Sequence, residues 1–300
     1  MYAGFYHLNA DPFCLRPDSR FRFSHASYSK ARAYMLYALQ RAEGFVVVTG
    51  APGTGKTTLI KDIVATLTRS NYNISHLVTT RLSANDLLRS IAYSFGIANE
   101  GMDKATLLSR LQLYLLEQRR ARRQTLLIVD EAQDLSRNAL EELRLLTNLE
   151  ENNEPLLQIF LVGQKQFLRL MQLEVMEQFK QRIVAACELK PLSSHEIKNY
   201  VLHRLKVAGW KQDPALDSNI FPHLSHFSKG VPRKINQILS RLFLHGYVED
   251  RHKLNAGDFS EIISEIKSEQ LSMSLFQTGS LDESSEPRNP ILKVYSSAHH

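Results

Sequence analysis

The chain has 300 residues, a formal net charge of +6 and 43% hydrophobic residues, enough apolar material for two domains or for one domain with a small appendage. Its two cysteines, Cys14 and Cys187, lie far apart without metal-type spacing, which argues against a disulfide framework and fits a reducing cytosol. The first ten residues do not resemble a signal peptide, and the apolar runs are too short to span a bilayer. We therefore expect a cytoplasmic protein whose membrane association, if any, comes through a partner.

The chain opens with an irregular, aromatic extension over residues 1–26, in which Pro12 and Pro17 act as breakers. A helix is predicted over residues 29–41, and the apolar run 45–48 is predicted to be a buried strand. Directly after it, residues 50–57 have the form G-x-x-x-x-G-K-S/T, and residues 59–67 have helical spacing. A strand, this loop and a helix together indicate a phosphate-binding loop, with an ordinary glycine-rich turn as the alternative.

Each residue type in this loop has a chemical reason. Glycines tolerate the backbone angles that turn N–H groups inward around phosphates. Lys56 is expected to reach the β- and γ-phosphates, and the Thr57 hydroxyl is expected to hold Mg²⁺. The predicted nucleotide ligands of the loop are Gly50, Ala51, Pro52, Gly53, Thr54, Gly55, Lys56, Thr57 and Thr58.

A strand is predicted over residues 74–78, followed by a helix that Ser83 caps and that ends before Gly96. A longer amphipathic helix is predicted over residues 103–119. It runs into a basic cluster made of Arg119, Arg120, Arg122 and Arg123. Positive charge at a helix C-terminus complements the helix dipole, and a patch for nucleic acid or an acidic partner is the alternative.

The next strand, residues 126–131, ends in two carboxylates. Asp130 is expected to hold Mg²⁺ through its water shell, and Glu131 is expected to polarise the attacking water as general base. Because side chains alternate along a strand, the two carboxylates are expected to leave it in different directions. The alternative is that the pair caps the following helix. A glutamate here favours hydrolysis over a nucleotide kinase.

A helix opening at Ser136 and a buried strand over residues 156–162 continue the alternation of strands and helices, which indicates a parallel sheet covered on both faces. Ligands of such sheets lie at the carboxyl ends of the strands, where both motifs are found. Gln164 follows a strand end and is predicted to hydrogen-bond the γ-phosphate or the attacking water, or else to be a solvated loop residue. Arg182 could reach the site of a neighbouring subunit, or form an ion pair within the chain.

After Pro191 the pattern becomes helical, with helices predicted over residues 193–207, 216–228, 232–248 and 257–270 and no strands between them. Arg233 stands near a helix N-terminus, where positive charge is unfavourable, so an external anion such as a nucleotide phosphate is the expected partner, with an ordinary surface arginine as the alternative. Arg204 could also be a site residue, but its helical spacing favours a surface position. The predicted domains are the extension 1–26, an α/β domain over 27–190, a helical domain over 191–270 and a disordered tail over 271–300.

Taken together, these residues resemble the AAA+ ATPases, and within them the general secretion pathway protein A type. Relatives of that type include ATPases of mannose-sensitive pilus biogenesis and of exosortase and exopolysaccharide clusters. The resemblance covers about residues 1–270. It rests on Phe5-Tyr6, Asp11-Pro12-Phe13, Pro17-Asp18, Glu43-Gly44-Phe45 with the phosphate loop, residues 130–135, Leu161 to Gln164, Pro191-Leu192, His203-Arg204-Leu205 and residues 230–236.

The resemblance implies an α/β P-loop core with strand order 5-1-4-3-2, followed by a small helical lid. It implies ATP and Mg²⁺ at a subunit interface of a homo-oligomer, with Gln164 as sensor 1, Arg233 as sensor 2 and Arg182 as the arginine finger. The function it implies is ATP hydrolysis that drives assembly or regulation of a secretion, pilus or exopolysaccharide-export machine, with a protein partner in the envelope. The alternative is a DNA-dependent ATPase similar to transposition helper proteins; a scaffold that binds ATP without turnover is a third possibility.

Overall fold

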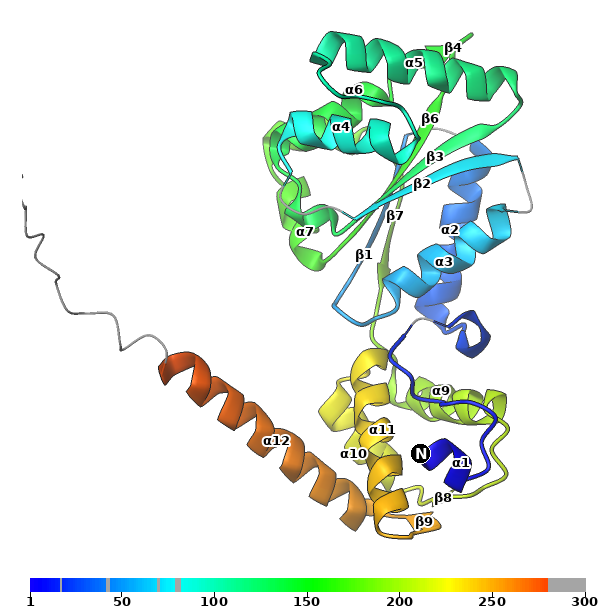
Figure 1. Cartoon of the computed structure of the whole chain (residues 1–300), viewed down its shortest axis with the longest axis vertical. Helices are drawn as coiled ribbons and strands as arrows, with labels where there is room; N and C mark the ends of the chain where they lie inside the picture. Colours follow the sequence, from blue (N-terminus) through cyan, green and yellow to red (C-terminus); the bar gives the residue numbers. More distant parts are fainter. Residues whose placement is uncertain (17, 42–43, 69–70, 79–81, 280–300) are drawn as a thin grey trace, which may run out of the picture.

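The computed structural model of the chain describes residues 1–16, 18–41, 44–68, 71–78 and 82–279. Figure 1 shows an α/β domain above a smaller helical lid, with the N-terminal segment running through the lid before it enters the α/β domain. None of the helices in these described ranges is long and apolar enough to cross a membrane.

The α/β domain is built on a five-stranded parallel sheet. Its strands are β1 (Phe45–Gly50), β2 (Tyr72–Val78), β3 (Gln124–Asp130), β6 (Leu157–Gly163) and β7 (Ile183–Leu189), and they lie in the order β2-β3-β6-β1-β7. Numbered along the chain from first to fifth and read from β7, this is the predicted order 5-1-4-3-2, which is confirmed. A short hairpin of β4 (Glu150–Glu151) and β5 (Glu154–Pro155) precedes β6.

Alternation along the strands divides the core into two layers. Val46 and Val48 face α2 (Ala26–Arg41) and α3 (Lys56–Leu67), while Phe45 and Val47 face the opposite layer. That layer contains α4 (Ala84–Ser94), α5 (Lys104–Arg120), α6 (Arg137–Leu146), α7 (Lys165–Met171), η3 (Glu174–Met176) and α8 (Glu177–Lys180). Both faces of the sheet are therefore covered, as the sequence predicts (Figure 1).

The strand β7, the fifth strand of the order that the resemblance implies, was not located from the residue pattern. It lies at an edge of the sheet beside β1, and just two of its residues, Ala185 and Leu189, are buried. An edge strand with half-exposed positions lacks the continuous apolar run that marks β1 and β6, so periodicity alone does not find it.

The lid consists of α9 (Ser194–Val207), α10 (Ile220–Ser228), α11 (Pro232–Val248) and the first part of α12 (Ala256–Gly279). A two-residue pairing of β8 (Ala215–Leu216) with β9 (Lys253–Leu254) interrupts the helices, contrary to the prediction of helices alone. Helix α12 continues to Gly279, so the predicted disordered tail does not begin at residue 271. The residues before Gly279 include Leu, Met and Gln, which favour helix, and residues 280–300 lie outside the described part.

The N-terminal extension belongs structurally to the lid. It forms α1 (Tyr2–Phe5) and the short helix η1 (Ser19–Phe21), and its side chains Tyr6, Leu8, Phe13 and Phe21 are buried in the lid's own core. The Tyr6 hydroxyl donates to the Arg251 carbonyl over 2.9 Å. The aromatic character of the extension thus reflects burial against helices that are about 200 residues away in the chain.

Candidate nucleotide site

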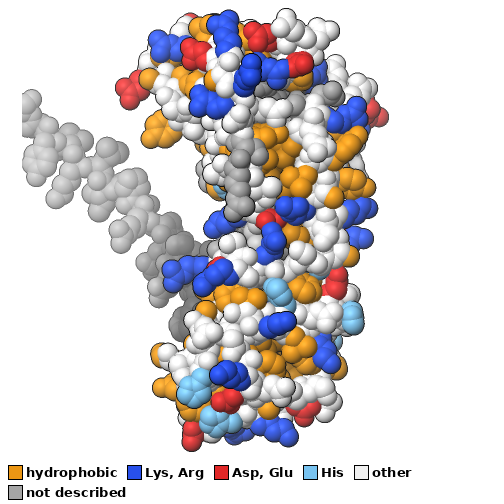
Figure 2. Space-filling model, turned by 90° about the vertical axis from the view of Figure 1, so that its right-hand side faces the viewer, with side chains coloured by type: hydrophobic (Ala, Val, Ile, Leu, Met, Phe, Trp, Pro, Cys, Tyr) orange, Lys and Arg blue, Asp and Glu red, His pale blue; other side chains and the backbone are white. Residues whose placement is uncertain are grey.

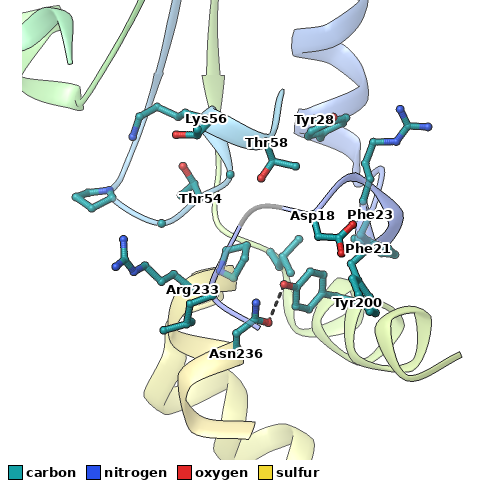
Figure 3. A pocket seen from close by; sticks show the side chains of 18 of the residues that line it. Asp18, Phe21, Phe23, Tyr28, Thr54, Lys56, Thr58, Tyr200, Arg233 and Asn236 are labelled. Atoms are coloured by element: carbon teal, nitrogen blue, oxygen red, sulfur yellow. Dashed lines mark hydrogen bonds between the residues drawn. The ribbon is translucent and has the colours of Figure 1, made fainter. Parts of the chain in front are cut away.

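A cavity lies at the carboxyl ends of the central strands, between the α/β domain and the lid (Figure 3). One end of it is formed by the phosphate loop, Glu131 and Gln164. The other end is formed by the N-terminal extension and the lid. The residues that line this second end include Leu15, Asp18, Phe21, Phe23, His25, Tyr28, Tyr200, Arg204 and Asn236. The predicted motifs therefore meet at one place in the structure.

The phosphate loop has the backbone that its glycines predict. Gly53 and Gly55 have φ angles of 81° and 101°, in the left-handed region that favours glycine, and Gly55 is the N-cap of α3. The Thr54 hydroxyl donates to the Ala51 carbonyl over 2.8 Å and closes the loop on itself. At Gly50, an added Cβ would lie 2.8 Å from the Leu189 carbonyl oxygen, so β7 leaves no room for a side chain there.

Lys56 is buried and turned back onto the loop. Its ammonium donates to the carbonyls of Gly50 over 3.0 Å and of Ala51 over 3.3 Å. Burial lowers the pKa of Lys56, while the charges of Glu131 and Asp130 act in the opposite direction. A phosphate group in the cavity would offer this ammonium stronger, charged acceptors than two carbonyls.

Asp130 and Glu131 diverge, but not by strand alternation. The strand β3 ends at Asp130, and Glu131 has a φ of 54°, so the chain turns sharply between them. The Asp130 carboxylate accepts the Glu131 N–H over 2.9 Å. The alternative that this pair caps a helix does not hold for α6, whose cap is Ser136, with a hydroxyl that accepts the Ala139 N–H over 3.2 Å. Glu131 does occupy the N-cap position of the short helix η2 (Ala132–Asp134), but its side chain makes no capping hydrogen bond there.

Glu131 is held by two glutamines. Its Oε2 accepts hydrogen bonds from Gln133 Nε2 over 2.7 Å and from Gln164 Nε2 over 3.4 Å. The Gln133 Oε1 in turn accepts the Gln164 backbone N–H over 2.8 Å. Gly163 permits this approach, since an added Cβ would lie 2.9 Å from the Gln133 oxygen. Gln133 lies within the motif over residues 130–135 but was assigned no role from the sequence; its position two residues after Glu131 was the available signal.

The lid touches the phosphate loop directly through the start of α11. Pro232 occupies the first helical turn, and the Arg233 N–H donates to the Gly53 carbonyl over 3.2 Å. The exposed Arg233 side chain lines the cavity beside the loop (Figure 3). The unfavourable positive charge at this helix N-terminus thus faces the place where the sequence predicts an anion.

Arg182 lies elsewhere. It immediately precedes β7, its carbonyl accepts the Phe45 N–H over 2.8 Å, and its guanidinium donates to the Thr147 hydroxyl over 3.3 Å. Phe45 begins β1, so Arg182 is at the amino-terminal edge of the sheet, away from this chain's own cavity. Arg182 therefore cannot act on the cavity of its own chain. Its role as an arginine finger in the site of a neighbouring subunit stays a prediction.

Thr57 and Asp130 offer the oxygen donors that Mg²⁺ prefers. The Thr57 side chain is exposed and lines the cavity, whereas Asp130 is buried at the end of β3 with its Oδ2 3.9 Å from the His76 Nε2. Within the described ranges, no group of three or more His, Cys, Asp or Glu side chains could hold a metal ion. Mg²⁺ ordinarily keeps waters and binds substrate phosphates beside one or two protein ligands, so this sparse donor set fits it.

Arg204 corrects a prediction, because it is buried and lines the cavity. Its guanidinium donates to the Pro12 carbonyl, to the Tyr200 hydroxyl over 3.1 Å and to the Cys14 carbonyl over 3.4 Å. Helical spacing placed it on the solvent face of α9, but the returning N-terminal extension covers that face. A contact between residues about 190 positions apart leaves no periodic signal in the sequence.

The AAA domain family matches residues 39–171 of the chain. Over 261 residues, the chain is 34% identical to the general secretion pathway protein A of Aeromonas hydrophila, a match that covers 87% of this chain and 47% of that protein. The chain belongs to the AAA+ ATPase family. Within the family it is of the general secretion pathway protein A type, and it spans about half the length of that relative.

Solved structures of AAA+ proteins share this fold. The ORC1 protein of Aeropyrum pernix, solved in complex with DNA, has a TM-score of 0.65 at 15% identity, covering 93% of this chain and 78% of that one. The ORC2 protein of the same organism, solved as ADPNP–ADP complexes, has a TM-score of 0.58 at 17% identity, covering 83% and 72%. Both likenesses concern the fold, and this AAA+ chain shares it across the α/β domain and the lid.

Proposed function

We propose that this AAA+ chain binds ATP with Mg²⁺ in the cavity and hydrolyses it to ADP and phosphate. The observation that carries the proposal is the meeting of four separate segments around one space: the loop over 50–58, Glu131, Gln164 and Arg233. These segments come from three strand ends and one lid helix, and each contributes the residue type that phosphoryl transfer needs.

In the proposed mechanism, loop N–H groups and Lys56 neutralise the phosphates, Thr57 and Asp130 would hold Mg²⁺, and the ion would supply further positive charge to the phosphates. Glu131 orients and polarises the attacking water, and Gln133 and Gln164 fix its carboxylate. Arg233 adds positive charge from the lid side. Arg182 of a neighbouring subunit would stabilise transition-state charge, which requires a homo-oligomer.

Calorimetry and phosphate release test the proposal together. ATP uptake should require an intact Lys56, and Glu131→Gln should keep ATP binding while turnover falls by about 100-fold or more, because the general base is lost. A matched control is Glu141→Gln, which removes an exposed carboxylate of α6. Unchanged turnover in Glu131→Gln would remove Glu131 as the base, and lack of nucleotide uptake by the unaltered chain would refute the function.

A mixing experiment tests the role of Arg182 in a neighbour's site. Arg182→Ala subunits keep their own Glu131, and Glu131→Gln subunits keep Arg182. Mixed oligomers should therefore recover some of the activity that each variant lacks alone. No recovery, with oligomers intact by light scattering, would count against a finger acting between subunits.

We further infer that hydrolysis serves assembly or regulation of an envelope machine for secretion, pilus biogenesis or exopolysaccharide export, from the cytoplasm or the inner-membrane surface. The likeness to a general secretion pathway protein A supports this role. Co-purification of Glu131→Gln with its partner from native membranes, compared with the unaltered chain, tests it. Recovery of the same proteins with both forms and without ATP would argue against a nucleotide-driven role.

A DNA-dependent ATPase is the second candidate. Arg119, Arg122 and Arg123 line a groove with Tyr72 and Gln124 at the start of β2 and β3, although Arg119 is also paired with Glu154. Among the described residues on the face in Figure 2, basic side chains are interspersed with acidic and apolar ones and form no continuous surface. Hydrolysis that is indifferent to DNA at low salt would exclude this candidate.

A further inference from the structure

The N-terminal extension connects the lid to the α/β domain along the cavity. We use the term strap for its described residues 11–16 and 18–25, which lead from the lid-packed segment to α2 on the sheet (Figure 1). Strap residues form one wall of the cavity, at the end away from Lys56, and Asp18, Phe21 and Phe23 are seen there in Figure 3. The strap is fastened at both ends.

Arg204 on α9 fastens the strap to the lid. A buried charge is costly unless hydrogen bonds satisfy it, and two of the acceptors here are strap carbonyls, those of Pro12 and Cys14. The guanidinium also lies 4.8 Å from the centre of the Phe21 ring, within cation–π range. No carboxylate of the described residues forms an ion pair with Arg204, so the strap itself provides most of its partners.

Asp62 fastens the other end of the strap to the α/β domain. It pairs with Arg22 of the strap, with Arg32 Nε over 2.7 Å, and accepts from the Tyr28 hydroxyl over 3.2 Å. Asp62 lies on α3, the helix that begins at Lys56 of the phosphate loop. The strap therefore has one anchor in the lid and one on the helix that follows the phosphate loop.

The two ends of the cavity depend on different contacts. The phosphate loop closes through its own bonds, from Thr54 to Ala51 and from Lys56 to Gly50. The far end has aromatic side chains, of which Phe21 and Tyr28 are buried while Phe23 of the strap is half-buried and lines the cavity. An aromatic ring in that position is suited to the face of a planar base. The placement of Phe21 and Phe23 depends on the strap, and the strap is fastened by Arg204 and Arg22.

We propose that Arg204 is a positioning residue that seats the strap as the base-side wall of the nucleotide cavity, with Arg22 as the second anchor. The inference rests on the proposed nucleotide function and adds that affinity for the base, separate from affinity for the phosphates, is set through these two arginines. Arg204 also lines the cavity, but its guanidinium donates to two strap carbonyls and to the Tyr200 hydroxyl. Its effect on the nucleotide therefore runs through the strap, and it governs the Michaelis constant for ATP rather than the chemical step.

Comparing ATP with inorganic tripolyphosphate, which has no base, separates the two ends. In Arg204→Ala, calorimetry should show ATP binding weakened by about tenfold or more, the loss expected when a base forfeits an aromatic stacking surface. Tripolyphosphate affinity should change less than twofold. In turnover assays KM for ATP should rise by a similar factor while kcat stays within about twofold. Equal weakening of both ligands, or no weakening of ATP, would overturn the inference.

Three further variants test the second anchor, the specificity of the effect and the need for the guanidinium group. Arg22→Ala removes the other anchor at a half-exposed position, and should produce the same base-dependent loss to a smaller degree even if Arg204→Ala fails to fold. Arg241→Ala removes a lid arginine paired with Glu269, outside the cavity, and should leave both affinities unchanged. Arg204→Lys keeps the charge but not the forked donors, and should resemble Arg204→Ala.

The unaltered chain distinguishes failure of the inference from failure of the function. If it binds ATP and tripolyphosphate with equal affinity, nucleotide binding stands and the base-side role falls. If it takes up neither ligand, the proposed function fails and the inference with it. A loss of ATP affinity in the Arg241→Ala control as large as that in Arg204→Ala would also overturn the role of the strap. It would mean that any disturbance of the lid is enough to weaken binding of the base.

Discussion

The two ends of the cavity were built in different ways. The phosphate end is one continuous loop, with two partners that follow strand ends, and the bonds within the loop span six residues or fewer, as in Lys56 to Gly50. The base end combines the N-terminal strap, α9 and α11, and its key bond joins Arg204 to Pro12 across 192 positions. Chemistry concentrated in a short loop can be inferred from residue order, whereas chemistry assembled from distant segments cannot.

The difference also separates what each end recognises. Charged groups at the phosphate end act on phosphate oxygens through a buried ammonium and backbone amides. The base end offers rings and carbonyls, held by two arginines that need not touch the nucleotide. The following substitutions either confirm that the two ends are separable or show that they act as one unit.

The largest effect is expected at the phosphate end. Lys56→Ala removes the only ammonium that the loop motif places in the cavity, and should weaken ATP and tripolyphosphate alike by about 100-fold, the loss expected for a charged hydrogen-bonding partner. Calorimetry with both ligands measures it. A loss confined to ATP would show that the comparison between the two ends is wrong.

Gly53→Ala tests the contact between loop and lid. An added Cβ would lie 2.6 Å from the Arg233 Cβ, and the residue would also be strained at a φ of 81°. Gly55→Ala is the matched control, because its φ is 101° and no atom lies within 4 Å of the added Cβ. Both should lower the free energy of unfolding by about 1 to 3 kcal/mol, with Gly53→Ala the more costly. If urea denaturation shows the same loss of unfolding free energy in both variants, the lid shifts to accommodate the added methyl group without measurable cost.

Gln133→Leu tests the support of the general base. It removes the hydrogen bond to Glu131 Oε2 and the acceptor for the Gln164 N–H. Turnover should fall by about tenfold with KM for ATP unchanged, because a misplaced base harms the chemical step rather than binding. Steady-state phosphate release measures both constants. A rise in KM without a fall in kcat would assign Gln133 to binding instead.

The smallest effect is expected from Asp62→Asn. Burial acts to raise the pKa of Asp62, but the hydrogen bond from Arg32 and the charges of Arg22 and Arg32 lower it overall below the usual 3.8. A lowered carboxyl pKa stabilises the fold above that value, and the stabilisation disappears as the pH falls through the folded-state pKa. Asp62→Asn should therefore lower the free energy of unfolding by about 1 kcal/mol at pH 7 and by less below about pH 4.

Urea denaturation at pH 7 and pH 3 measures this difference. The exposed pair of Glu141 with Arg144 is the control, and Glu141→Gln should cost less than about 0.5 kcal/mol at pH 7. If the loss of unfolding free energy in Asp62→Asn stays constant down to pH 3, the lowered pKa of Asp62 would be contradicted. The strap would then be anchored by neutral hydrogen bonds alone.

Predictions from the sequence were correct where the contacts join residues close together in the chain, and wrong where they join distant segments. The run over 45–48 and the loop after it predicted β1 and α3, and caps such as Ser83 and Ser136 mark helix starts in the structure. The edge strand β7, with two buried positions, was missed because its pattern is interrupted. Arg204 was misplaced because periodicity describes a helix face but not the segment that returns to cover it.

The sequence by itself determined the alternation of strands and helices and the position of the phosphate loop and its acidic partners, because turn chemistry, burial periodicity and charge act between near neighbours. Tertiary structure alone decided that the extension joins the lid core, that Gln133 and Gln164 bracket Glu131, and that Arg204 faces inward. Those arrangements depend on which distant surfaces bury one another, and many sequences with the same local pattern could bury them differently.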